Sequence, residues 1–381
     1  MRMYSRDLEK ILKAQSFKGK AIIIVGPRQV GKTTLVKKII DVFSVNKTKI
    51  KTLNCDNLTD RESLEEKDLE FLDKIIGDSK ILFIDEAQKV QNIGQTLKIL
   101  VDHFGKKIQI FATGSSSLNL LDLTQEPLTG RKFVYTLYPL SLTEIYPDKD
   151  FLKIQKGLEQ FLVFGTYPEV VSQKSFLAKT ELLQELSSSY LYKDILEFQK
   201  IKNPSILSKL LKALALQIGQ EVSYNELSNL LGIDKATVES YIDLLEKCFV
   251  IFRLPPFAQN KRKEIARLRK IYFYDLGIRN AQINNFNFLE SRDDTGKLFE
   301  NFMIIERLKH RQYKRIFASQ YFWRTYDGSE VDLIEERGGK LYGYEFKWNK
   351  KKYSRKPVKW LEYKNALFKV ITKEDISEFL L

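Results

Sequence analysis

Residues 20–40, KAIIIVGPRQVGKTTLVKKII, decide the fold of the first part of the chain. An apolar run, a loop with two glycines and an amphipathic stretch predict a buried strand, a tight loop and a helix. The loop from Gly26 to Thr33 matches the pattern G-x-x-x-x-G-K-[ST], in the strand–loop–helix context that this motif requires. The stretch therefore predicts an α/β fold in which backbone N–H groups and a helix N-terminus bind phosphates.

The loop also predicts the cofactors, which are ATP and Mg²⁺. Lys32 is expected to reach the β and γ phosphates, and the Thr33 hydroxyl is expected to bind magnesium. The glycines let the backbone approach the ligand closely. The full set of predicted nucleotide-binding residues is Gly26, Pro27, Arg28, Gln29, Val30, Gly31, Lys32, Thr33 and Thr34.

A second motif, KILFIDEAQKV at residues 80–90, predicts the acidic half of the same site. Four apolar residues form a central strand, and Asp85 and Glu86 follow at the end where ligands bind parallel sheets. Asp85 can hold magnesium through water, and Glu86 can orient or deprotonate an attacking water. A carboxylate there favours hydrolysis over transfer to a small acceptor. The alternative is a pair of acids that cap a helix.

A third strand, KIQIFATGSSS at residues 107–117, carries polar residues at its tip. Thr113, Ser115 and Ser116 are expected to contact the γ-phosphate or the attacking water, with Ser115 as the catalytic member. Arg131, in LTGR, is predicted to be an arginine finger or a phosphate sensor, or else an ordinary surface arginine.

The stretch SEVDLIEERGGKLYGYEFKW, residues 329–348, predicts a β-hairpin around two glycines. Counting outward from the turn predicts the cross-strand pairs Arg337–Lys340, Asp332–Glu345 and Glu330–Lys347. Like charges directly opposite each other destabilise a sheet, and a divalent cation would remove the repulsion between Asp332 and Glu345. The alternative is a solvated face with an exposed Glu330–Lys347 ion pair.

Residues 223–254 predict a helix–turn–helix followed by a strand suited to a wing. Ser223 and Glu226 fit a capping box at the start of the first helix. The second helix is slightly acidic, whereas a recognition helix brings positive charge to DNA. A structural or protein-contact role is therefore favoured over DNA readout.

Composition narrows the class of protein further. The 381 residues include 43% hydrophobic and 12% aromatic residues, which excludes wholesale disorder, and the net charge of +14 favours a polyanionic partner. Basic residues mixed with aromatics at 347–359, and a second basic cluster ending at Lys270, suit nucleic acid or a solvated surface. Two distant cysteines, no apparent signal peptide and only short apolar runs predict a cytoplasmic protein without a membrane span.

Taken together, the motifs resemble a known family. The segments GPRQVGKTTL, LFIDEAQKV, FATGSSS and LTGRKFVYTLYPLSLTEI, followed by VFGTYPEVV, YLYKDILEF, KIYFYDLGIRNA, GKLFENFMIIERL and FWRTYDGSEVDLI, resemble uncharacterised prokaryotic AAA-type ATPases with a C-terminal domain of unknown function. The resemblance implies an AAA-type P-loop ATPase domain at 1–150, a helical lid at 151–202, a winged-helix-like module at 203–258 and a C-terminal α/β domain similar to restriction-endonuclease-like nucleases at 259–381.

The same resemblance implies a second set of site residues. Asp332 and Glu345 would bind magnesium, with Glu300 contributing from the preceding helix. Lys347 would stabilise the attacked phosphate or help to activate water. Such enzymes often share sites between subunits, so a homo-oligomer would let Arg131 act in trans.

Three functions follow as hypotheses. The first is an ATP hydrolase whose nucleotide state controls a nucleic-acid-directed, magnesium-dependent nuclease-like domain. The second is a signalling or scaffold ATPase with a non-catalytic C-terminal binding module, and the third is a helicase or translocase.

Overall fold

The computed structural model describes residues 3–44, 48–65, 68–115, 128–190, 203–258, 268–325, 328–349 and 357–380. They belong to two compact units. The nucleotide unit comprises Met3–Pro139 and Lys247–Phe249, and the C-terminal unit comprises the described residues of 140–246 and 250–380. The four-part division expected from the sequence stays a prediction.

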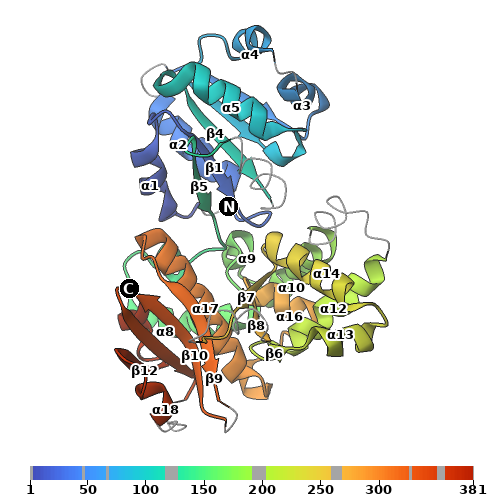
Figure 1. The fold of residues 1–381 in the computed structure, drawn as a ribbon, viewed down its shortest axis with the longest axis vertical. Coiled ribbons are helices and arrows are strands. Elements are labelled where there is room, and N and C mark those ends of the chain that lie inside the picture. Colours follow the sequence, from blue (N-terminus) through green and yellow to red (C-terminus); the bar gives the residue numbers. More distant parts are fainter. Residues whose placement is uncertain are drawn as a thin grey trace. The chain divides into compact units, whose positions relative to one another are not determined.

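The nucleotide unit is built on a five-stranded parallel sheet (Figure 1) with the strand order β2-β3-β4-β1-β5. Its strands are β1 (Ala21–Val25), β2 (Ile50–Asn54), β3 (Ile81–Asp85), β4 (Gln109–Gly114) and β5 (Lys132–Thr136). All five residues of β1 are buried, because β1 lies inside the sheet and both of its faces are covered. The predicted α/β fold with a P-loop on a parallel sheet is confirmed.

Helices cover this sheet. They are α1 (Leu8–Gln15), α2 (Lys32–Ser44), α3 (Leu58–Glu65), α4 (Leu69–Ile76) and α5 (Ile93–Phe104), with short 3-10 turns η1 (Ala87–Lys89) and η2 (Gly105–Lys107). Alternate residues of β1 pack with α3, α4 and α5 in one core. The amphipathic stretch after the P-loop forms α2, the helix that the motif requires. This helix contacts β3 and β4.

The C-terminal unit begins with helices. These are α7 (Leu142–Ile145), α8 (Phe151–Phe164), α9 (Pro168–Ser172), α10 (Phe176–Glu185), the π-helical turn η3 (Leu186–Tyr190) and α12 (Pro204–Leu216), and α16 (Leu276–Gln282) packs against α8 and α10. Asp275 caps α16 and accepts a hydrogen bond from the Thr166 backbone N–H at 2.7 Å. A Cβ on Gly277 would lie 2.3 Å from the Phe164 carbonyl oxygen. The segments VFGTYPEVV and KIYFYDLGIRNA thus meet in a close-packed junction.

The predicted helix–turn–helix residues form α13 (Tyr224–Leu231) and α14 (Lys235–Lys247). A three-stranded antiparallel sheet flanks them in the sequence, with β6 (Glu221–Val222) before the helices and β7 (Ile251–Leu254) and β8 (Arg269–Phe273) after them, in the order β6-β8-β7. The Ser223 side chain caps α13. Arg253 on β7 pairs with Asp243 and Glu246 of α14. The acidity of α14 therefore serves an internal contact.

A four-stranded sheet with the order β12-β11-β10-β9 forms the C-terminal end (Figure 1). Its strands are β9 (Ser319–Arg324), β10 (Glu330–Arg337), β11 (Lys340–Lys347) and β12 (Ala366–Thr372). The helical elements of this region are η4 (Leu289–Ser291), α17 (Thr295–Lys314), α18 (Val358–Leu361) and α19 (Ile376–Leu380). Strand β10 is antiparallel to β9 and β11, and β11 is parallel to β12. The buried Arg307 guanidinium on α17 donates to both carboxylate oxygens of Glu335 at 2.9 Å, which fixes the helix to the sheet.

Candidate functional site

The P-loop joins β1 to α2 at the carboxyl edge of the parallel sheet. Gly26 has a φ of +148°, and a Cβ there would lie 2.1 Å from the Leu137 carbonyl oxygen. Gly31 has a φ of +93°. Both positions therefore need glycine, the first because of the neighbouring backbone and the second because of its own conformation.

Lys32 and Thr33 are the last two residues of the motif, and their side chains bind polar groups at this edge of the sheet. The buried Lys32 ammonium donates to the carbonyls of Gly26 at 2.8 Å and Pro27 at 2.7 Å. The Thr33 hydroxyl lies 3.0 and 2.9 Å from the two carboxylate oxygens of Asp85, and the Thr113 hydroxyl donates to the same carboxylate. The structure thus places together the hydroxyl and the carboxylate that the sequence assigned to one magnesium ion.

These oxygens fit Mg²⁺. A nucleotide-bound magnesium ion needs only one or two protein ligands, because phosphates and water complete its coordination, and hard oxygen donors suit it. Thr33 and Asp85 would hold the ion, and Lys32 would contact the phosphates.

Glu86 takes part in a second polar contact next to Asp85. It adopts a left-handed conformation with a φ of 53°, and its carboxylate accepts a hydrogen bond from Gln88 Nε2 at 2.6 Å. Gln88 also donates to the Ser115 hydroxyl at 3.1 Å. The predicted water-activating Glu86 and the predicted sensor Ser115 are therefore linked by one buried amide, whereas Ser116 lies outside the described residues.

Arg131 lies at the opposite edge of the sheet. It precedes β5, and its carbonyl accepts a hydrogen bond from the backbone N–H of Ala21, the first residue of β1. Its guanidinium binds the partly exposed Asp102 at 2.5 Å. Because the P-loop follows the other end of β1, a phosphate-sensing role within the same chain does not fit, and the role in trans stays a prediction.

Arg6, which was not among the predicted site residues, holds the P-loop in place. Its buried guanidinium donates to the Val30 carbonyl at 2.6 Å and to the Tyr138 carbonyl at 2.5 Å. The two carbonyls belong to the P-loop and to the segment after β5. The partners lie 24 and 132 residues away in the sequence, so no local pattern signals this contact. Gln88, by contrast, is two residues beyond Glu86 in its motif and could have been found by that spacing.

The C-terminal hairpin has the predicted register near its turn. Strands β10 and β11 pair from Arg337–Lys340 to Leu333–Tyr344. Next to this region, the pairing of β10 with β9 shifts between Val331 and Ile334. The shift is a β-bulge, which redirects side chains in a strand.

Beyond the bulge the predicted pairs are replaced by other contacts. The Asp332 carboxylate accepts a hydrogen bond from the Phe346 backbone N–H at 2.8 Å. Glu330 pairs with Lys270, and Lys347 pairs with Glu345 at 2.7 Å. The expected Glu330–Lys347 pair is thus corrected, because Lys270 approaches this end of β10 from another strand.

Lys270, on β8, is the centre of an ionic group. Its buried ammonium contacts Glu330 and lies 3.2 Å from Glu300 and 3.8 Å from Asp332. We call these three acids the acidic cluster. Tyr272 donates a hydrogen bond to Glu300 at 2.6 Å.

Charge and burial oppose each other in this group. Burial alone would lower the pKa of the Lys270 ammonium, but the charges of Glu300, Asp332 and Glu330 outweigh it and raise the pKa. Burial and the charge of Glu300 raise the pKa of Asp332 well above its usual value, although Lys270 opposes the shift. One ammonium thus stays charged among three carboxyl groups.

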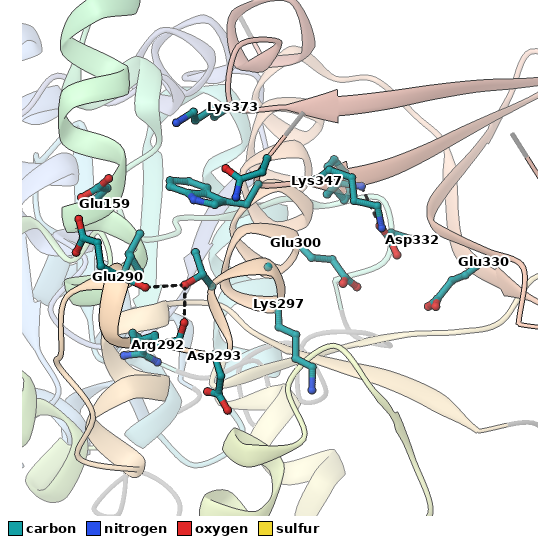
Figure 2. A pocket seen from close by; sticks show the side chains of 16 residues that line it. Glu159, Glu290, Arg292, Asp293, Lys297, Glu300, Glu330, Asp332, Lys347 and Lys373 are labelled. Carbon is teal, nitrogen blue, oxygen red and sulfur yellow. Dashed lines mark hydrogen bonds between the residues drawn. The ribbon is translucent and has the colours of Figure 1, made fainter. Parts of the chain in front are cut away.

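The acidic cluster opens into a pocket of about 800 Å³ (Figure 2). Glu300, Glu330, Asp332 and Lys347 line it, as Figure 2 shows. Trp348 lines it as well. Glu345 is not among the lining residues. Within the described part of the chain, no three His, Cys, Asp or Glu side chains are placed so that they could hold a metal ion. The three carboxylates predicted to bind magnesium instead have other partners: Lys270 lies beside Glu300 and Asp332, and Lys347 pairs with Glu345.

The basic segments expected to bind nucleic acid lie largely outside the described residues, at 259–267 and 350–356. Among the described helices, none is both long enough and apolar enough to cross a bilayer.

Comparisons with known proteins agree with this architecture. An AAA domain matches residues 18–146, a domain of unknown function (DUF8612) matches residues 155–288, and another domain of unknown function (DUF4143) matches residues 295–376. The second match spans most of the segment predicted as lid and winged-helix module.

The chain is similar to uncharacterised proteins. One from Mycobacterium tuberculosis is 26% identical over 347 residues, which cover 90% of this chain and 73% of the relative. One from Methanocaldococcus jannaschii is 26% identical over 397 residues, covering 98% and 86%.

Among solved structures, the replication initiator DnaA bound to AMPPCP and single-stranded DNA is 16% identical, with a TM-score of 0.35, covering 63% of this chain and 86% of that one. At this TM-score the similarity adds nothing to the strand order described above. The family models that match residues 18–146 and 295–376, an AAA domain and a C-terminal domain of unknown function, agree with the family that the sequence resembles.

Proposed function

We propose that this chain is an ATP hydrolase whose nucleotide state controls a C-terminal unit directed at nucleic acid. The observation that carries the proposal is the direct contact between the Thr33 hydroxyl and the Asp85 carboxylate, beside the P-loop lysine. Lys32 and Thr33 begin α2, directly after the loop that follows β1, and Asp85 is the last residue of β3. Both β1 and β3 are parallel to β4 and end at the same edge of the sheet.

The chain's own residues divide the chemistry between them. Lys32 and the loop N–H groups bind and orient the phosphates. A bound magnesium ion would neutralise charge on the phosphates, held by Thr33 and Asp85. Glu86 accepts a proton from the attacking water or orients it, and Gln88 fixes the Glu86 carboxylate relative to Ser115.

An ATPase assay on matched variants tests this assignment. Lys32→Ala should abolish turnover, and Glu86→Gln should keep ATP binding while turnover falls by about 100-fold or more. Lys49→Ala is the control, because its ion pair with Asp78 is exposed and lies away from the P-loop in the sequence. Undiminished turnover in Lys32→Ala would refute the proposal.

One observation favours a second function for the C-terminal unit. Lys270 pairs with the acidic cluster and so takes the contacts that a magnesium ion would need. This is expected of a binding module without catalysis and not of a magnesium-dependent nuclease. In this case the protein is a nucleotide-switched scaffold.

Incubation of purified protein with single- and double-stranded DNA and RNA, with Mg²⁺ or Mn²⁺, separates the two. Cleavage that is lost in Asp332→Ala, with ATP turnover intact, supports the nuclease. Salt-sensitive binding without strand breaks supports the scaffold.

A further inference from the structure

The carboxylates of the acidic cluster are held in place by neutral donors as well as by Lys270. Tyr272 donates to Glu300, and the Phe346 N–H donates to Asp332. The β-bulge at Asp332 lets this carboxylate reach the backbone of β11. The cluster is therefore an ordered group of acids, fixed by contacts from β8 and β11.

The Lys270 side chain is built into this group. Its side chain is only 3% exposed, and the ammonium lies 5.6 Å from the centre of the Phe322 ring, an arrangement that favours a cation. Phe322 itself is the β9 residue opposite the bulge, because its neighbours Tyr321 and Trp323 pair with Ile334 and Val331. The bulge that redirects Asp332 thus lies against the residue that covers Lys270.

A divalent cation does not fit beside this ammonium. Mg²⁺ and Ca²⁺ bind carboxylate oxygens at roughly 2.0–2.6 Å, and these same oxygens face the lysine. Two cations next to each other repel, and the buried ammonium has little water around it to screen this repulsion. For a metal ion to enter, the buried lysine would have to leave all three acids.

We infer that the Lys270 ammonium is the resident cation of the acidic cluster and keeps divalent metal ions out of it. The cluster is then independent of metal in the natural protein, and loss of the lysine charge lets its acids rearrange around a hard divalent or trivalent cation. This inference concerns the C-terminal unit alone and goes beyond the proposed ATPase, so either can fail without the other.

Metal titration of nucleotide-free full-length protein tests the inference. Tb³⁺ is the first probe, because Trp348 lines the same pocket and can sensitise its luminescence, and Mn²⁺ in calorimetry is the second. Lys270→Met removes the charge and keeps an unbranched apolar side chain. It should bind both ions at least about 100-fold more tightly than wild type, because three carboxylates then lack their cation.

Two further variants assign the binding to this cluster. Lys270→Met combined with Asp332→Asn should lose most of the gain, and Lys270→Arg, which keeps the charge, should behave like wild type. Binding by the nucleotide unit is present in every variant and therefore cancels in the comparison.

The wild-type protein gives a result even if Lys270→Met folds poorly. Mn²⁺ should shift the melting temperature of the wild type and of Asp332→Asn by the same amount. It should raise the melting temperature of Lys270→Met further. Mn²⁺ binding by wild type that is lost in Asp332→Asn would overturn the inference. So would a folded Lys270→Met protein that gains no affinity for either ion.

Discussion

Removal of the Arg6 guanidinium is expected to loosen the P-loop. Arg6→Ala takes a charged donor away from two buried carbonyls, those of Val30 and Tyr138. A hydrogen bond from a charged group contributes about 1.5–3 kcal/mol, so the free energy of unfolding of the nucleotide unit should fall by about 3 kcal/mol. If half of that loss falls on the Val30 contact, the Kd for ATP should rise about tenfold, because 1.4 kcal/mol corresponds to a factor of ten.

Urea unfolding and titration with a fluorescent ATP analogue measure the two effects. Arg6→Lys is the graded variant, since one ammonium can keep one of the two carbonyls and should recover about half of the lost stability. Lys49→Ala, which breaks an exposed ion pair in the same unit, should leave both quantities unchanged. If Arg6→Ala behaves like Lys49→Ala in both assays, the assignment of Arg6 to the P-loop is wrong.

Three other predictions follow from the described contacts. Gly26→Ala should abolish ATP binding in the same titration, because its Cβ would lie 2.1 Å from a carbonyl oxygen in a conformation that favours glycine; normal affinity would contradict the loop geometry. Gly277→Ala should lower the melting temperature of the C-terminal unit, because its Cβ would lie 2.3 Å from a backbone oxygen, and the free energy of unfolding should fall by about 1–3 kcal/mol or more. Gly296→Ala is the control, since its Cβ meets nothing within 4 Å and should not destabilise the unit. Equal effects of the two substitutions would contradict the close packing of the junction. Burial raises the pKa of the Cys55 thiol to about 12, so its reaction with a thiol reagent at pH 8 should be far slower in the native protein than in the unfolded chain; labelling at the rate of the unfolded chain would contradict the burial.

The nucleotide site was largely predictable because its chemistry is local. Gly26, Lys32 and Thr33 lie in one short motif, and Asp85 follows an apolar strand that can only be central. Their contact follows from parallel strands whose ends meet at one edge. Arg131 was harder to assign. Its motif, LTGR, suggests a phosphate contact, but only the direction of β5 shows that it lies at the edge of the sheet opposite the P-loop.

The C-terminal site was less predictable because it depends on a bulge and on a distant strand. Nothing in VDLI, without glycine or proline, signals the shift between Val331 and Ile334. Lys270 belongs to a basic run that predicts a solvated or nucleic-acid-binding surface, and only the pairing of β8 brings it to the acids of α17 and β10. Cross-strand counting correctly gave the register at the turn and failed where the strand became irregular.

The contacts of the P-loop lysine bear on the release of product. Lys32 donates to two carbonyls of its own loop, so an incoming phosphate must compete with these carbonyls for the ammonium. The same carbonyls can take the ammonium back as a nucleotide departs. A loop that satisfies its own lysine would therefore bind a nucleotide less tightly than a loop whose lysine lacks such acceptors.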